Sequence, residues 1–184
     1  MCEKLKLYNE MKTIVFRDLR AEEIECRVQQ VKENGLVLLL YKDARVDMNI
    51  LDETVGNINW QRDHFECKGN LYCRVGINVA EDNSSSGWVW KADCGAESNT
   101  EAEKGEASDS FKRACVNWGI GRELYTSPFI WVKIEDANVS NKKCYDKFSV
   151  EKIQIVNKRI TGLAIRNDTL KRRVFVYFEQ TKEG

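Results

Sequence analysis

Two basic side chains, Lys112 and Arg113, lie next to each other in the stretch KGEASDSFKRACVNWGIGRELY. Ammonium and guanidinium groups are the cations that proteins use to neutralise phosphate. The stretch has helical spacing, however, and basic residues on a helix commonly cover apolar surface with their stems while their charges stay in water. The pair therefore has two interpretations, a solvated helix edge or a contact for nucleic-acid phosphates.

Further basic and aromatic residues occur on segments that we expect to neighbour this helix. The basic ones are Arg27, Arg45, Arg62, Arg74 and Lys91, and the aromatic ones are Tyr41, Trp60, Trp88 and Trp90. Basic and aromatic side chains together are typical of surfaces that bind single-stranded nucleic acid. Tryptophans of an antiparallel sheet can equally form a core, so composition leaves both interpretations open.

Other chemistries have few candidate residues. His64 is the only histidine, no C-x-x-C pair occurs, and both glycine-rich phosphate motifs are missing, so we expect no metal and no nucleotide cofactor. An alternative is a small metal-dependent nuclease that uses the following carboxylates: Asp47, Asp52, Glu53 and Asp63. We expect these carboxylates on exposed helix and loop faces, where a solvated surface is the simpler interpretation.

The bulk composition limits the classes of protein. The chain has 184 residues, 42% of them hydrophobic, which predicts one domain over residues 1–184. With 29 basic and 29 acidic residues, any site for a polyanion must be local. Seven cysteines without a signal peptide predict reduced, mostly buried thiols in the cytoplasm. The longest apolar run, Leu36–Tyr41, is too short for a bilayer, so we expect no membrane partner.

The periodicity of the sequence predicts an α+β fold. Helical spacing indicates helices over 19–35 and 45–56, and LVLLLYK reads as a buried strand between them. Aromatic and β-branched segments at 58–67, 71–80 and 87–95 predict an antiparallel meander. We expect one sheet with helices mostly on one face.

The helix that carries the basic pair has the best-marked ends. Ser98 and Glu101 form a capping box, and Gly119 and Gly121 mark the end of the helix. One stripe should pack across the meander, with Lys112 and Arg113 flanking it. Its members are Phe111, Ala114, Cys115 and Trp118.

The rest of the chain reads as strands around this core. FIWVKI is one strand, and the segments at 147–167 and 172–180 are two or three more, with a turn near Asn157 or Lys158. We divide the domain into a peripheral N-terminus (1–18), a core (19–134) and C-terminal strands (135–184).

Several of these motifs resemble the Rad52/Rad22 superfamily of DNA single-strand annealing proteins. They are YKDARVDMNILDETVGNINWQRD, LYCRVGI, WVWKADCG and the helix with GEASDSFKRA, together with D-x-G at Asp93 and Gly95. The resemblance covers about residues 20 to 132 and is nearest to the phage and prophage branch with Sak-type proteins and DNA damage response protein A.

The resemblance implies a ring-shaped homo-oligomer that holds single-stranded DNA in a basic groove and pairs it with a complementary strand, without catalysis and without ATP. It places the groove contacts on Lys112, Arg113 and Arg27, and more loosely on Tyr41 and Arg45. A further groove arginine of some members falls at Cys115 or Val116, so Arg122 is a substitute candidate.

The resemblance also implies a role in recombination or repair, with an exonuclease and a single-strand binding protein as possible partners. A second alternative to annealing is a structural or partner-recruiting protein that never contacts DNA. Binding of a labelled single strand separates that alternative from the annealing protein, and magnesium-dependent cleavage identifies the nuclease.

Overall fold

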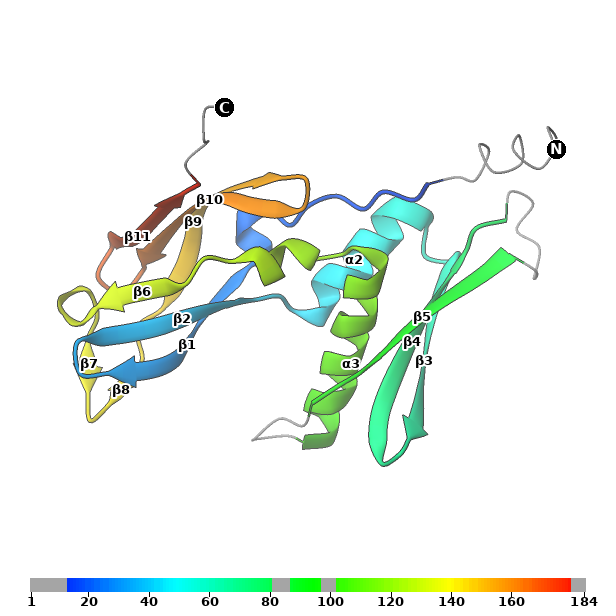
Figure 1. Ribbon diagram of the computed structural model, residues 1–184, viewed down its shortest axis with the longest axis horizontal. Coiled ribbons are helices and arrows are strands. Elements are labelled where there is room, and N and C mark those ends of the chain that lie inside the picture. Colours follow the sequence, from blue (N-terminus) through cyan, green and yellow to red (C-terminus); the bar gives the residue numbers. More distant parts are fainter. Residues whose placement is uncertain (1–12, 81–86, 97–101, 180–184) are drawn as a thin grey trace. The chain divides into compact units, whose positions relative to one another are not determined.

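The computed structural model describes residues 13–80, 87–96 and 102–179, and the chain divides into two compact units (Figure 1). The first unit comprises Asp47–Ile120 together with residues up to Arg17, and the second comprises Asp18–Val46 and Gly121–Gly184. Each unit is therefore assembled from two separate stretches of the chain.

A three-stranded antiparallel meander forms the sheet of the first unit. Its strands are β3 (Trp60–Cys67), β4 (Asn70–Asn78) and β5 (Trp88–Cys94), in the order β3-β4-β5. Lys68 and Gly69 have φ angles of 53° and 75°, the left-handed pair that closes a two-residue hairpin. The predicted meander is confirmed, while its polar tip at 81–86 lies outside the described residues.

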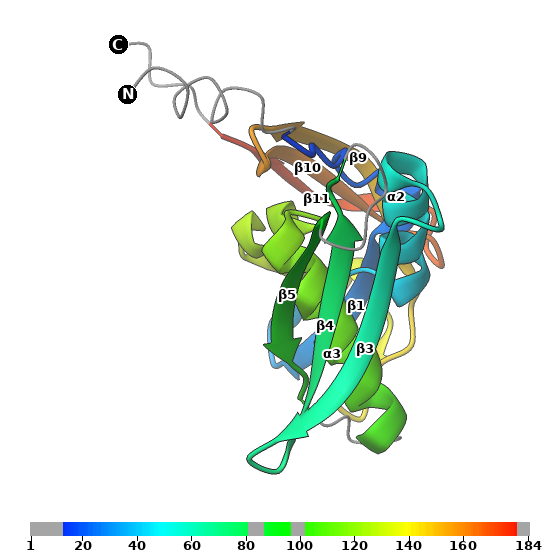
Figure 2. The ribbon, with the colours of Figure 1, turned by 90° about the vertical axis from the view of Figure 1, so that its right-hand side faces the viewer.

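The helix α3 (Ala102–Trp118) lies along one face of the meander (Figure 2). Phe111, Ala114 and Cys115 are fully buried, and the half-buried Trp118 donates its indole N–H to the Val75 carbonyl at 3.0 Å. The predicted stripe is confirmed because these side chains recur at i, i+3, i+4 and i+7 and so share one face.

The end of α3 is the predicted glycine turn. Gly119 has a φ of 99°, its N–H bonds to the Val116 carbonyl at 2.9 Å, and the Ile120 N–H bonds to the Cys115 carbonyl at 3.1 Å. This pair of hydrogen bonds is the Schellman motif, which needs a left-handed residue that glycine adopts without strain. The capping box predicted at Ser98 and Glu101 lies outside the described residues.

The helix α2 (Ala44–Val55) confirms the second predicted helix. Ile50 and Leu51 are fully buried, and the helix ends before Gly56, which has a φ of 83°. Asp43 stands at its start and accepts the Arg45 backbone N–H at 2.8 Å, as an N-cap side chain does.

Six strands form the main sheet of the second unit, in the order β11-β10-β9-β1-β2-β6. They are β1 (Glu25–Lys32), β2 (Gly35–Tyr41), β6 (Ile130–Lys133), β9 (Phe148–Val156), β10 (Arg159–Asn167) and β11 (Arg172–Phe178). The second unit also contains three 3-10 helices, η1 (Ala21–Glu23), η3 (Arg122–Thr126) and η4 (Ile134–Asp136). A separate two-stranded hairpin consists of β7 (Val139–Ser140) and β8 (Lys143–Cys144).

Two predictions about the elements are wrong. The helix expected over 19–35 is the short η1 followed by β1, because Cys26 and Val28 alternate with exposed Glu25 and Arg27 and so present one face to the sheet. The single sheet expected is also wrong, since the meander and the six-stranded sheet are separate. The α+β class itself is confirmed.

The C-terminal strands belong to the same sheet as β1. β9 pairs with β1 through Cys26 and Phe148, and the turn predicted near Asn157 and Lys158 is confirmed by φ angles of 51° and 62°. The strands β9, β10 and β11 therefore extend the sheet that begins with the hairpin of β1 and β2.

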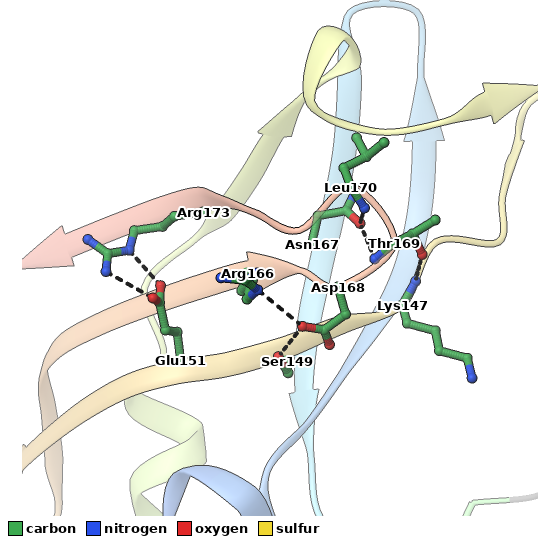
Figure 3. A network of polar contacts seen from close by, with 9 residues as sticks. All are labelled: Lys147, Ser149, Glu151, Arg166, Asn167, Asp168, Thr169, Leu170 and Arg173. Atoms are coloured by element: carbon green, nitrogen blue, oxygen red, sulfur yellow. Dashed lines mark hydrogen bonds and ion pairs between the residues drawn. The ribbon is translucent and has the colours of Figure 1, made fainter.

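Polar contacts tie these C-terminal strands together (Figure 3). Arg173 on β11 donates to Glu151 on β9 at 2.6 Å, and Ser149 donates to Asp168 at 3.0 Å. The buried Asn167 accepts two backbone N–H groups of the following turn, both at 3.1 Å. These contacts fix the β10–β11 turn, although each exposed ion pair adds little stability.

The cysteines within the described residues are thiols. Cys73 and Cys115 are buried, Cys26, Cys94 and Cys144 are half-buried and Cys67 is exposed, so the prediction that most are buried is wrong. The described cysteines form no disulfide. Burial raises the pKa of the Cys73 thiol to about 11, so it stays protonated at neutral pH.

Candidate nucleic-acid interface

Lys112 and Arg113 lie on α3 beside the stripe that packs on the meander, and Arg113 reaches Asp93 of β5. Successive helix residues are about 100° apart, so the two side chains leave the buried face around Phe111 and Ala114 on opposite flanks. Both are half-buried, and neither belongs to the buried stripe. The prediction that they flank this stripe is confirmed.

The two cations differ in their surroundings. Arg113 Nε lies 3.5 Å from Asp93 Oδ1 on the neighbouring strand β5. Among the described residues, Lys112 takes part in no ion pair, and Asp109, one turn earlier, accepts the Ala96 N–H at 3.1 Å. Lys112 therefore has no carboxylate partner in the described part of the chain.

The D-x-G motif at the end of β5 positions this part of the helix. Asp93 also accepts the Cys94 N–H at 2.9 Å, which holds its carboxylate beside Arg113. A Cβ on Gly95 would collide with the Glu106 carbonyl of α3 and come within 2.9 Å of the Ser110 nitrogen. Only glycine lets the strand approach the helix backbone this closely.

Two other basic residues of the first unit contact aromatic rings of α3. The Arg62 guanidinium lies 4.7 Å from the centre of the Phe111 ring, and Lys91 Nζ lies 4.4 Å from that of Trp118. Lys91 also donates to the Asn117 carbonyl at 3.0 Å. These cation–π contacts serve the packing of helix on sheet.

Arg27 and Tyr41 lie together in the second unit. Arg27 is on β1 and Tyr41 ends β2, and the guanidinium lies 5.0 Å from the centre of the tyrosine ring. Glu25, two residues before Arg27 and therefore on the same side of the strand, accepts from its Nε at 3.0 Å. The positive charge of Arg27 is thus partly offset.

Arg45 has the same kind of partner. Its Nε donates to Asp43 at 2.9 Å, and the side chain is 81% exposed. Hydrogen bonding to Asp43 raises the pKa of the Arg45 guanidinium, and the nearby charges of Asp43 and Glu25 add to the effect. Arg27, Tyr41 and Arg45 therefore belong to one polar cluster with two carboxylates.

The predicted contacts fall into two groups. Lys112 and Arg113 belong to the first unit, and Arg27, Tyr41 and Arg45 to the second. Cys115 is fully buried, so its position offers no groove contact, and the substitute candidate Arg122 is exposed on η3 in the second unit.

A scan against protein families matches residues 8–143 to the Rad52/22 family of double-strand break repair proteins. The chain belongs to this family. Rad52-family proteins are non-catalytic annealing proteins, so membership implies binding and annealing of single-stranded DNA. Neither the curated proteins nor the solved structures yield a match.

The carboxylates of the nuclease alternative are dispersed in this Rad52-family chain. Asp47 is fully buried, so the exposure expected for it is wrong. Asp52 accepts the Trp60 indole N–H at 2.6 Å, Glu53 pairs with Arg17, and Asp63 pairs with Arg74. Across the described residues, no three His, Cys, Asp or Glu side chains gather as metal ligands would.

A helix that crosses a membrane must be both long and apolar. No helix described here combines the length and the apolar character that a bilayer crossing requires.

Sequence reasoning missed the acidic partners of the basic residues. Glu25 could have been found if residues 25–32 had been read as a strand, because residues two apart share a face. Asp43 carries the signal of an N-cap before a helix. Asp93 had no local signal, because it meets Arg113 only when β5 packs on α3.

Proposed function

We propose that this Rad52-family protein binds single-stranded DNA with α3 as its main phosphate contact and anneals complementary strands without ATP or a metal ion. The observation that carries the proposal is the position of Lys112. It lies outside the buried stripe of α3, and no carboxylate of the described residues pairs with it. A phosphate is the natural counter-charge for such an ammonium group.

In this proposal the protein binds the phosphate backbone of the DNA and leaves the base edges exposed for pairing. Lys112 and Arg113 neutralise phosphates from the helix, while Arg27 and Arg45 add contacts from the second unit. Tyr41 is 37% exposed, and its ring, with Arg27 over one side, is the candidate for stacking with a base. Phosphate contacts carry no sequence information, so the unpaired bases remain free to sample a second strand.

We further propose the assembly and setting of the protein. The annealing domain spans residues 1–184 and forms a ring-shaped homo-oligomer of the Sak-type and DNA damage response protein A branch, acting in the cytoplasm. We propose an exonuclease and a single-strand binding protein as its partners. Light scattering and negative-stain images test the ring, and a monomeric mass at micromolar concentration would contradict it.

Binding and annealing can be tested with the full chain. Fluorescence anisotropy of a labelled oligonucleotide at several salt concentrations measures affinity, and a quenched pair of complementary strands measures annealing. The Lys112→Ala, Arg113→Ala double variant should keep its melting temperature, because neither side chain is in the core, and should lose most of its binding.

The same assay separates the alternative functions. Annealing should persist with a chelator and without ATP; a strict requirement for either a metal or ATP would overturn the mechanism. Magnesium-dependent cleavage of the strand would indicate a nuclease. No binding by the wild type at low salt would favour a partner-recruiting protein.

A further inference from the structure

The face of the meander opposite α3 carries a row of aromatic side chains. Strand alternation places Cys73, Val75 and Ile77 of β4 on the helix side, where they are fully buried. Residues that lie directly opposite one another on paired strands share a side of the sheet, so the pairing identifies the residues on the side away from α3. We call this side the outer meander face. It comprises Gln61, Asp63 and Phe65 of β3, Tyr72, Arg74 and Gly76 of β4, and Trp88, Trp90 and Ala92 of β5.

Two stacked pairs of aromatic rings and one guanidinium group lie on this face. The Phe65 and Tyr72 rings stack with their centres 5.5 Å apart and an angle of 22° between their planes. Trp88 and Trp90 stack at 6.0 Å with an angle of 28°, and the Arg74 guanidinium lies 4.7 Å from the centre of the Trp90 ring. The planar guanidinium of Arg74 thus extends the Trp88–Trp90 pair, and the Phe65–Tyr72 pair follows on the same side of the sheet.

The absence of a side chain at Gly76 leaves the space that the Trp90 indole occupies. Gly76 lies opposite Trp90 in the ladder, and a Cβ added there would come within 2.8 Å of the indole ring. The indole therefore lies over the strand and not upright from it. Trp90 and Phe65 remain 37% and 39% exposed. A side chain that is already ordered and still accessible loses little entropy when a ligand stacks on it.

The residues between the rings are polar. Asp63 holds Arg74 at 2.9 Å across the strands, and Gln61 is exposed beside Gly76. This face therefore alternates rings with hydrogen-bonding groups. A nucleobase has the matching character, with an apolar face and polar edges.

We propose that unpaired bases of single-stranded DNA stack on the outer meander face, with Trp90 and Phe65 as the principal platforms. The inference rests on the proposed function, because it assigns a base contact to the same ligand whose phosphates bind α3. Asp63 and Arg74 cancel in charge, so this contact adds affinity with little dependence on salt.

The test uses full-length variants in which an aliphatic side chain replaces a ring: Trp90→Leu, Phe65→Leu and the double variant. Val89→Ala is the matched control, since Val89 is 42% exposed on the same strand but faces the other side. Binding is measured by anisotropy with oligothymidylate and with an abasic oligonucleotide of equal length, across a salt series.

Each ring removed should weaken oligothymidylate binding about ten-fold. The slope of affinity against salt and the binding of the abasic strand should stay unchanged, and Val89→Ala should bind as wild type does. Should Trp90→Leu fail to fold, Phe65→Leu near the end of its strand provides the same comparison.

Three results would overturn the inference. They are unchanged oligothymidylate binding, an equal loss with the abasic strand, or a change in assembly mass by light scattering, which would make this face a contact between copies of the chain. Failure of the proposed function is distinguishable, because then the wild type itself binds neither strand at low salt.

Discussion

The helix α3 of the first unit and the β1–β2 hairpin of the second carry basic residues in different electrostatic settings. In the hairpin region, Arg27 and Arg45 each hold a carboxylate two residues away, Glu25 and Asp43. On α3, Arg113 has Asp93 at 3.5 Å, and Lys112 has no carboxylate partner among the described residues. A phosphate must therefore compete with a carboxylate for Arg27, Arg45 and Arg113, whereas no carboxylate of the described residues pairs with Lys112.

Local geometry explains the difference. Residues two apart in a strand share a side, so Glu25 meets Arg27 directly. Asp43 caps α2 and so stands beside Arg45. On α3 the acidic residue one turn before Lys112, Asp109, is turned to the Ala96 backbone. The comparison teaches that, in a chain with no net charge, a polyanion site depends on which cations lack an internal partner.

The largest effect that we expect comes from Gly95→Ala, which should push β5 away from the backbone of α3. The added Cβ meets the rigid Glu106 carbonyl, so the variant should lose about 3 kcal/mol of unfolding free energy. Urea denaturation measures it. Gly69→Ala is the control, since its φ of 75° strains alanine but nothing lies within 4 Å, and it should lose about 1 kcal/mol.

Lys112→Ala should weaken single-strand binding by about 1 to 3 kcal/mol, because charge-assisted hydrogen bonds to phosphate are lost. The salt slope should fall by roughly 0.7. Arg27→Ala should lose less, since Glu25 already offsets that charge. Lys112→Arg is the control that keeps the charge. An Arg27→Ala defect larger than that of Lys112→Ala would reverse the comparison.

The smallest effect is a gain of binding. Glu25→Gln and Asp43→Asn each remove a carboxylate that competes with phosphate for an arginine, so each should tighten binding by a factor of about two. The salt slope should rise by roughly 0.7 for each arginine that reaches the DNA. Weaker binding of either variant would mean that the carboxylates orient the arginines and do not compete with DNA.

Strong local patterns made most of the first unit predictable. The meander, α2, the buried stripe of α3 and its glycine end follow from periodicity and turn chemistry. The second unit was less predictable, because residues 19–35 contain both helical and alternating spacing, and pairing with β2 and β9 selects the strand. That misassignment also concealed Glu25 as the neighbour of Arg27.

The sequence by itself determined the α+β class, the elements around α3 and the resemblance that led to Lys112, Arg113, Arg27, Tyr41 and Arg45. These depend on residues close in the chain. Tertiary structure alone decided which cations have a carboxylate partner, that the meander and the six-stranded sheet are separate, and that rings from β3, β4 and β5 form one face. The physical reason is that charge compensation and stacking depend on distance in space, and pairing of distant strands sets that distance.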